Sequence, residues 1–225
     1  KEIKMKIAIG ICARNEESSI IPMLDSLISP VLKNPNGIKF HIFICANGCN
    51  DQTVPLVQAW RAKNYAVPSS LFVMDEANLV ESQRTIVNET KKFGFESIIF
   101  LDADIIVDKN CLSELVKNSV DEKIKVAYAV SIPIQRKSQS LMEKALNLYD
   151  TSCGIFSERK HLHGRAFLIK IDAWDIPNTS PRLIADDIYL SFCLLKNFGC
   201  NSIKKIPTAK VGFNQVSSYA DFYKA

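Results

Sequence analysis

The first hundred residues alternate between short apolar runs and longer segments with helical patterning. Four apolar runs have the length and composition of buried strands, and they cover residues 6–12, 39–46, 70–74 and 98–101. The segments with helical patterning cover residues 15–32, 53–64 and 82–93. Strands that alternate with helices of this length predict an α/β protein with a mostly parallel, doubly wound sheet.

The pattern becomes less regular after residue 104. Helices are expected over residues 109–118, 138–156 and 186–196, and strands over 126–132, 163–169, 203–207 and 209–212. No internal repeat, linker or low-complexity tract divides the chain. We therefore expect one domain over residues 1–225, with two halves that meet near residue 104.

Composition restricts the class of protein. The chain of 225 residues is 47% apolar and 23% charged, which is typical of a globular domain with a sizeable core. The net charge of +4 comes from scattered Lys and Arg, so no nucleic acid partner is expected. The odd count of seven Cys, without a signal peptide, indicates reduced thiols in a cytoplasmic protein. No apolar run reaches the roughly 18 residues of a membrane span. The chain begins with Lys1 rather than Met, which is consistent with a fragment.

Two carboxylates follow the fourth apolar run directly. The run over residues 98–101 leads into Asp102-Ala103-Asp104. In open α/β sheets, ligands bind beyond the carboxyl ends of the strands. Carboxylate oxygens there suit Mg²⁺ or Mn²⁺, which leave coordination positions for a substrate phosphate. The pattern predicts a site for a metal and a diphosphate, although a lone Asp-x-Asp is also common in solvated turns.

The loops after the first and second strands form a second group of candidates. Ala13 and Glu16 are expected to lie against a nucleotide base and its ribose, and the Asn47 amide can hydrogen-bond a base such as uracil. Gly48 permits a positive φ, and the helix that starts near Thr53 presents free N–H groups to an anion. The alternative is a pair of ordinary capped helix starts.

Asp186 and Asp187 begin a helical pattern in the second half of the chain. Acidic residues at a helix start are favoured by the macrodipole alone. They could also serve catalysis, because an acceptor hydroxyl needs a positioned carboxylate to take its proton. Only one of two neighbours on a helix faces a given site, so we assign Asp187 as the general base and Asp186 as its support.

Three further residues are candidates for a sugar or acceptor pocket. His163 and Gly164 precede an apolar run and could line the pocket floor, although a half-exposed His without a role is common. Trp174 lies closer to the expected site than Trp60 does, and both indoles are expected mainly to pack.

In this order and spacing, the motifs resemble the family-2 glycosyltransferases with the GT-A fold. The resemblance rests on Ala13-Arg14-Asn15-Glu16-Glu17, on the loop over residues 46–53, on Asp102-Ala103-Asp104, on the Gly-containing run over 164–169 and on the segment over 186–191. It implies a Rossmann-like, mostly parallel central sheet flanked by helices, with a small antiparallel portion on the acceptor side. Residues 1–104 would then form the nucleotide-binding half, and residues 105–225 the acceptor-binding half.

The resemblance also implies the activity and its partners. Members of this family transfer a hexosyl group from a UDP- or GDP-sugar to an acceptor hydroxyl, with Mg²⁺ or Mn²⁺ and usually with inversion. By position, the metal would be held by Asp104 and Asp102, and Asp102 would also face the ribose or sugar. The other donor-side positions are Ala13, Arg14, Glu16, Asn47 and, more loosely, Arg84. A glycan or lipid-linked acceptor, a role in the cell envelope and a place at the cytoplasmic face of a membrane follow by analogy.

Departures from the family pattern refine this expectation. Asn47 stands where the family often has Asp, and Asp186 stands where it usually has Glu. Residues 215–219 keep only Gln and an aromatic residue of the Gln-x-x-Arg-Trp motif of processive members, which favours the addition of single sugars.

Two alternative functions stay open from the sequence. A sugar-1-phosphate nucleotidyltransferase would carry a Gly-rich loop after the first strand, and this chain has none there. A non-catalytic nucleotide-sugar-binding module would have lost the metal or base carboxylates, which are present.

Overall fold

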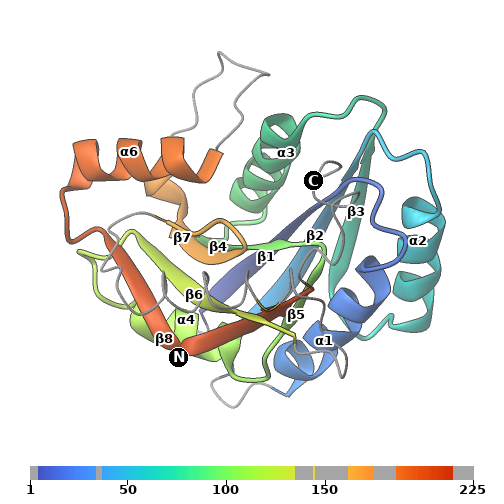
Figure 1. Cartoon of the computed structure of the whole chain (residues 1–225), viewed down its shortest axis with the longest axis horizontal. Coiled ribbons are helices and arrows are strands. Elements are labelled where there is room, and N and C mark those ends of the chain that lie inside the picture. The colour runs from blue at the N-terminus through green and yellow to red at the C-terminus, as the bar shows by residue number, and fades with distance from the viewer. Residues whose placement is uncertain (1–4, 34–36, 135–143, 145–161, 175–185, 215–225) are drawn as a thin grey trace.

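The computed structural model describes residues 5–33, 37–134, 144, 162–174 and 186–214, and these residues form one mixed sheet covered by helices on both faces (Figure 1). The sheet has eight strands in the order β3-β2-β1-β4-β7-β6-β8-β5. The strands are β1 (Lys6–Ala13), β2 (Lys39–Asn47), β3 (Ser69–Met74), β4 (Ser97–Asp102), β5 (Ile105–Val107), β6 (Val126–Pro133), β7 (Ala166–Lys170) and β8 (Ile203–Phe213). The helices are α1 (Ile20–Leu32), α2 (Thr53–Lys63), α3 (Leu79–Lys92), α4 (Cys111–Asn118) and α6 (Asp186–Phe198), with a 3₁₀ turn over Ile171–Ala173.

Strands β3, β2, β1 and β4 are parallel to one another, as the alternating pattern predicted. Successive side chains of a strand point to opposite faces, and β1 contributes to a separate core on each face. Ile9 packs in the core beneath α1, α2 and α4. Ala8 packs in the core beneath α3 and α6, which lie together on the other side of the sheet (Figure 1). Burial on both faces explains why β1, β2 and β4 are almost continuously apolar, whereas the edge strand β3 is only partly buried.

The second half of the sheet is mixed. β7 is antiparallel to both β4 and β6, β8 is parallel to β6, and β5 is antiparallel to β8. Only Ala103 and Asp104 separate β4 from β5, although these strands are far apart in the strand order. A link of three peptide units spans at most about 11 Å, so the sheet must curl until its β5 edge returns to the end of β4.

Three sequence predictions differ in detail from the structure. α1 begins at Ile20 instead of residue 15, because Asn15 adopts a φ of +55° that no helix contains. The three-residue strand β5 was too short to show a pattern. The two strands expected over 203–207 and 209–212 are one strand, β8, whose pairing with β6 shifts at a bulge that holds Pro207. Proline has no N–H for the ladder and is tolerated at such bulges.

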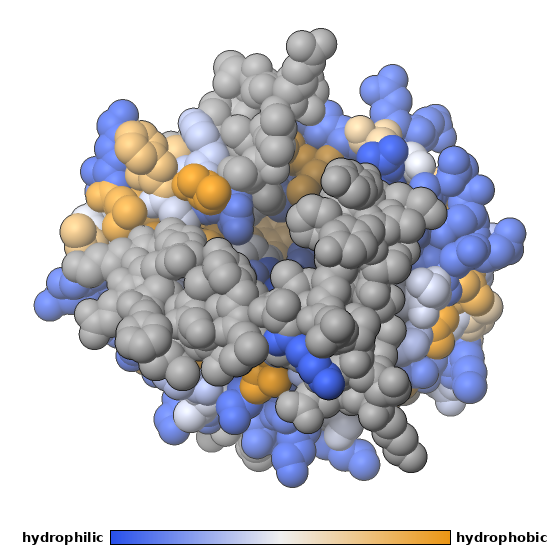
Figure 2. All heavy atoms as spheres, viewed as in Figure 1, coloured by the Kyte–Doolittle hydropathy of each residue, from blue (hydrophilic) through white to orange (hydrophobic). Residues whose placement is uncertain are grey.

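Some predictions lie outside the described residues, namely most of the helix over 138–156 and the motif over 215–219. Within the described ranges, no helix is long and apolar enough to cross a membrane. α6 exposes the apolar side chains of Ile188 and Phe192, and hydrophobic side chains gather over this helix in Figure 2.

Candidate active site

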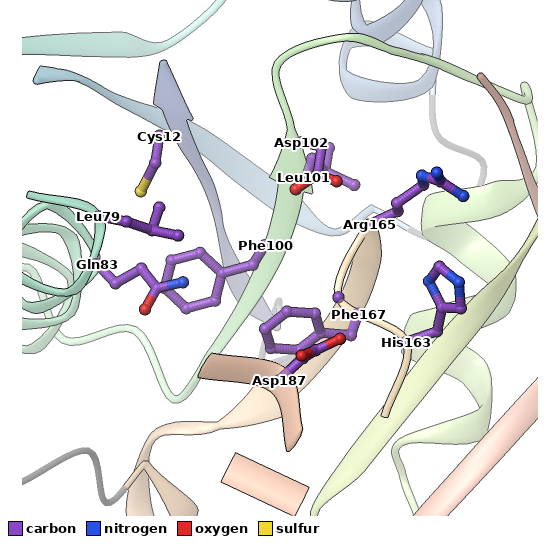
Figure 3. Close-up of a pocket in the computed structure, with 11 residues that line it drawn as sticks. Cys12, Leu79, Gln83, Phe100, Leu101, Asp102, His163, Arg165, Phe167 and Asp187 are labelled. Carbon is purple, nitrogen blue, oxygen red and sulfur yellow. The ribbon is translucent and has the colours of Figure 1, made fainter. Parts of the chain in front are cut away.

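A cavity of about 300 Å³ lies at the carboxyl end of β4 (Figure 3). Its lining consists of Cys12, Leu79, Gln83, Phe100, Leu101, Asp102, His163, Gly164, Arg165, Phe167 and Asp187. The rings of Phe100 and Phe167 pack with their centroids 5.5 Å apart. β1 and α3 supply the side of the cavity that carries Cys12, and the segment before β7 supplies the side that carries Arg165 (Figure 3).

The Asp-x-Asp motif lies where the sequence predicted it. Asp102 ends β4 and Asp104 lies in the turn that follows, and both are exposed, whereas Ala103 between them is buried. The backbone N–H of Asp102 donates to the Arg165 carbonyl at 2.9 Å, which fixes the end of β4 against the start of β7. In the described part of the chain, no cluster of three or more His, Cys, Asp or Glu side chains could hold a metal. Two carboxylates nevertheless suit Mg²⁺ or Mn²⁺, which take their remaining ligands from phosphate oxygens and water.

Glu16 lies close enough to Asp104 for the two carboxyl groups to interact. Partial burial raises the pKa of Glu16, and repulsion from Asp104 and Asp51 raises it further, while a hydrogen bond from the Ser19 hydroxyl acts in the opposite direction. The protein therefore holds Glu16, Asp51 and Asp104 in one region of negative potential, which favours a cation.

The loops after β1 and β2 are locked together by hydrogen bonds. The N–H of Glu16 donates to Thr53 Oγ1 at 2.7 Å. The N–H of Glu17 donates to Asp51 Oδ2 at 3.0 Å, and the Glu17 carboxylate in turn accepts from the Gln52 N–H at 3.0 Å. This reciprocal bracing fixes the loop after β1 against the N-terminus of α2, so both loops form one rigid edge.

Asn47 is buried within this edge, with 3% of its surface exposed. Its Nδ2 donates to the Ala13 carbonyl at 3.2 Å, and Cys49 Sγ approaches the same carbonyl at 3.4 Å. The amide thus joins the ends of β1 and β2 and orients the Ala13 peptide, a role that the sequence did not indicate.

Gly48 adopts a φ of +60°, as its place in the loop predicted, and it also packs tightly. A Cβ at this position would lie 2.6 Å from the backbone nitrogen of Ala77, in the loop before α3. Gly48 therefore allows the loop after β2 to pack closely against the loop before α3.

Asp187 reaches the cavity from the start of α6. Its Oδ1 accepts from the Ile188 N–H at 2.8 Å, and its carbonyl accepts from the Ser191 hydroxyl at 2.7 Å. The Ser191 oxygen accepts from the Leu162 N–H at 2.8 Å, which ties α6 to the segment before β7. A Cβ on Gly164 would lie 3.3 Å from Asp187 Oδ2, so the glycine makes room for this carboxylate. Asp186 starts α6, and its side chain lies outside the described structure.

Of the predicted site residues whose side chains the structure describes, only Asp102, His163, Gly164 and Asp187 line the cavity. Asp104, Ala13, Glu16 and Asn47 lie in the turn and loops described above, and three further candidates lie elsewhere. Arg14 is exposed in the loop after β1. Arg84 forms an ion pair with Glu81 on α3. Trp174 stacks on the Phe100 ring with centroids 5.1 Å apart, so the indole supports a lining residue from behind.

Sequence reasoning did not assign Arg165 to the site. Arg165 is one of the residues that line the cavity, and its Cζ lies 3.7 Å from the centroid of the Phe213 ring. Only the antiparallel pairing of β7 with β4, with Ala166 opposite Leu101, brings Arg165 beside Asp102. The one available signal was its position directly after Gly164.

The site combines paired acidic residues beyond a parallel strand, a braced loop at a helix N-terminus and a carboxylate on α6. The family model described as glycosyl transferase family 2 matches residues 8–174. The chain therefore belongs to glycosyl transferase family 2. Comparison with curated proteins finds no match.

Solved structures with the same fold include several glycosyltransferases. The mannosyltransferase PcManGT from Pyrobaculum calidifontis, in complex with GDP-Man and Mn²⁺, is 13% identical with a TM-score of 0.71, over 97% of this chain and 59% of that chain. S. aureus TarS 1–349, in complex with UDP-GlcNAc, is 15% identical with a TM-score of 0.66, over 98% of this chain and 64% of that chain. The glucosyl-3-phosphoglycerate synthase from Mycobacterium tuberculosis, in complex with Mn²⁺, UDP and phosphoglyceric acid, is 17% identical with a TM-score of 0.63. The match covers 98% of this chain and 74% of that chain.

At these identities the likeness shows the fold, which is the GT-A fold that the sequence motifs predicted. The chain spans less than two thirds of the length of the first two structures.

Proposed function

We propose that this protein transfers a hexosyl group from a nucleotide-diphosphate sugar to an acceptor hydroxyl, with Mg²⁺ or Mn²⁺. The observation that carries the proposal is the placement of Asp102 and Asp187 in the lining of one cavity, on β4 and α6 respectively. In this proposal residues 1–225 form one domain, with a nucleotide-binding half to about residue 104 and an acceptor-binding half beyond it.

The donor binds along the edge formed by the loops after β1 and β2. Glu16 contacts the nucleoside there. Ala13 was predicted to do so too, but it is fully buried and shapes the edge through its carbonyl, which Asn47 holds. Arg14 and Arg84 are assigned to the donor side, where a cation can attract the phosphates before they reach the cavity.

Asp104 and Asp102 would hold the metal at the turn after β4. When bound, it stabilises the negative charge that develops on the leaving diphosphate. The surrounding negative potential from Glu16 and Asp51 supports cation binding at this turn.

Asp187 is the general base. It takes the proton of the acceptor hydroxyl as that oxygen forms a bond to the anomeric carbon and the bond from this carbon to the diphosphate oxygen breaks. Inversion requires attack from the face opposite the leaving group. Asp187 and Asp102 come to the cavity from different elements, α6 and β4, as a base and a metal ligand on separate parts of the site require.

The remaining assignments complete the acceptor side. Asp186 supports the base, and His163 and Gly164 line the pocket beside the sugar, with Trp174 behind Phe100. Non-processive transfer to a glycan or lipid-linked acceptor at the cytoplasmic face of a membrane, in cell-envelope synthesis, is proposed from the family alone.

The first test is a thermal-shift panel of UDP, GDP and their sugars, with and without Mn²⁺. A ligand that binds only the native state raises the melting temperature by mass action, and at 100 times its Kd it adds about 2.7 kcal/mol to the free energy of unfolding. We expect a metal-dependent shift with one nucleoside diphosphate. Folded protein that shifts with none of them would contradict the proposal.

Two variants separate binding from chemistry. Asp104→Ala should lose the metal-dependent shift. Asp187→Asn should keep it and lose about 10²- to 10⁴-fold in transfer rate, the usual contribution of a general base. Near-normal transfer by Asp187→Asn would remove the base assignment.

A further inference from the structure

Arg165 lines the cavity, and its guanidinium is held against an aromatic ring at the rim. Its Cζ lies 3.7 Å from the centroid of the Phe213 ring. Asp102 and Asp187 are lining residues of the same cavity. Among the described residues, the Arg165 side chain forms no ion pair with a carboxylate, and the ring of Phe213 is the contact that orients it.

Stacking on a ring leaves the N–H groups of a guanidinium available. These donors lie in the plane of the group, so a ring against its face does not block them. Their fixed fork matches the oxygens of a phosphate or a carboxylate and can hold either group with two hydrogen bonds. Arg165 is therefore prepared to bind an anion from the cavity.

The position of Arg165 indicates which substrate carries that anion. Figure 3 shows Arg165 and His163 on one side of the cavity and Cys12 and Leu79 on the other. Cys12 belongs to β1, and the loop that we assign to the nucleoside begins directly after this strand. The guanidinium thus lies away from the nucleoside edge, on the side that we assign to the acceptor.

The support under Arg165 is continuous with the proposed metal turn. Phe213 is 5% exposed and pairs with Ile105, which directly follows Asp104. The Arg165 carbonyl accepts from the Asp102 N–H on the other side. The sheet therefore fixes the Arg165 backbone and its stacking ring relative to Asp102 and Asp104.

We propose that Arg165 binds an anionic group of the acceptor, so that the preferred acceptor is a hydroxyl compound carrying a phosphate or a carboxylate. The inference rests on the proposed function, because it takes the site as one for sugar transfer. In it, Asp187 takes the proton of the hydroxyl while Arg165 holds the charged end of the same molecule. Phe213 is a positioning residue that acts through the guanidinium.

The test compares three probes that differ at one carbon: glucose, glucose 6-phosphate and glucuronate. Their binding is measured by calorimetry on protein already saturated with UDP or GDP and Mg²⁺, whichever nucleotide the thermal-shift panel selects. We expect at least one anionic probe to bind about tenfold more tightly than glucose, which is the range of a charge-assisted hydrogen bond. Preference for glucose 6-phosphate would indicate a phosphate on the acceptor, and preference for glucuronate would indicate a carboxylate.

Three variants locate the effect. Arg165→Gln should bring the anionic probes to the affinity of glucose and leave nucleotide affinity within about twofold. Phe213→Leu should retain the charge and lose part of the preference, because the guanidinium is no longer oriented. Lys196→Gln removes an exposed cation from α6 and is the matched control, so it should bind all probes like the wild type.

Some outcomes would overturn the proposal. Equal binding of the three probes by the wild type would do so. An equal loss of affinity for the anionic probes in Arg165→Gln and Lys196→Gln would also do so. Loss of nucleotide binding in Arg165→Gln would assign the guanidinium to the donor diphosphate instead. A wild type that binds no nucleotide with metal would contradict the proposed function itself, before any probe is added.

Discussion

Glu16 makes the stability of the free protein depend on pH. Its pKa is raised from 4.5, chiefly by burial and then by Asp104 and Asp51. As the pH rises from 4.5 through the raised folded pKa, the unfolded chain loses this proton first, so the free energy of unfolding falls. The cost is complete above the folded pKa and absent well below 4.5. An amide cannot ionise and still accepts from the Ser19 hydroxyl.

Glu16→Gln should therefore be more stable than the wild type at pH 7 in the absence of metal, and equally stable at pH 3.5. Urea unfolding in EDTA across this range measures the difference. A stability difference that does not change with pH would show that ionisation of Glu16 is not its cause.

Gly164 gives a second prediction at the scale of one residue. A Cβ there would lie 3.3 Å from both Cβ and Oδ2 of Asp187, so the carboxylate must move by a few tenths of an ångström. Small displacements of a reacting group are costly, and we expect Gly164→Ala to lower the transfer rate about tenfold. Metal-dependent nucleotide binding should be unchanged and serves as the internal control. Normal transfer in a variant whose structure shows a displaced Asp187 would argue against its role as base.

Substitution of two glycines with similar φ values can separate the cost of backbone strain from the cost of disturbed loop packing. Gly48 and Gly94 have φ values of +60° and +68°. A Cβ on Gly94 meets nothing within 4 Å, whereas a Cβ on Gly48 would overlap the backbone of Ala77. Gly94→Ala should cost about 1 kcal/mol for the left-handed conformation, and Gly48→Ala about 2 kcal/mol more for the overlap. Urea unfolding measures both, and equal costs would mean that the two loops separate easily.

Ser191 connects α6 to the segment before β7. Its buried hydroxyl donates to the Asp187 carbonyl and accepts from the Leu162 N–H. Ser191→Ala leaves that buried N–H without its acceptor, at a cost of about 2 kcal/mol. We expect a larger loss in kcat than in nucleotide affinity, because the hydrogen bonds position Asp187. Ser113→Ala, which removes an exposed hydroxyl on α4, is the control and should change stability by less than about 0.5 kcal/mol.

At the scale of elements, the sequence predicts what hydrophobic periodicity determines. The first four strands lie where they were expected, and β1, β2 and β4 have apolar runs because both faces of the sheet are covered there. Strand β5 has three residues and owes its existence to pairing with β8. Arg165 was missed for a similar reason, since only the pairing of β7 with β4 places it beside Asp102. Long-range pairing leaves no local pattern for a sequence argument to use.

At the scale of the molecule, one sheet crosses both halves of the chain. β4 pairs with β1 on one side and with β7 on the other, and the curl brings β5 back to the end of β4. The boundary near residue 104 separates the proposed roles of the two halves. It does not divide the sheet, because β4 of the first half pairs with β7 of the second. We expect such a structure to unfold as one cooperative unit.

The two tryptophans of the chain lie one in each half and can test this expectation. Trp60 is buried on α2, with Nε1 donating to Asp25 Oδ1 at 2.8 Å. Trp174 stacks on Phe100 behind the cavity. In Trp60→Phe the fluorescence reports the acceptor half, and in Trp174→Phe it reports the nucleotide half. In each variant, the urea transition followed by fluorescence should coincide with the transition followed by far-ultraviolet circular dichroism. Because both transitions are measured on the same variant, an effect of the substitution on stability does not enter the comparison.

Nucleotide and Mn²⁺ should change the fluorescence of Trp60→Phe, because Phe100 transmits contact from the cavity to the Trp174 indole. They should leave that of Trp174→Phe nearly unchanged. If the urea transitions separated from the circular dichroism in either variant, the halves would unfold independently. The braced donor edge would then be a separate unit, and the fixed distance from Asp102 to Arg165 would depend on ligand instead of on the sheet.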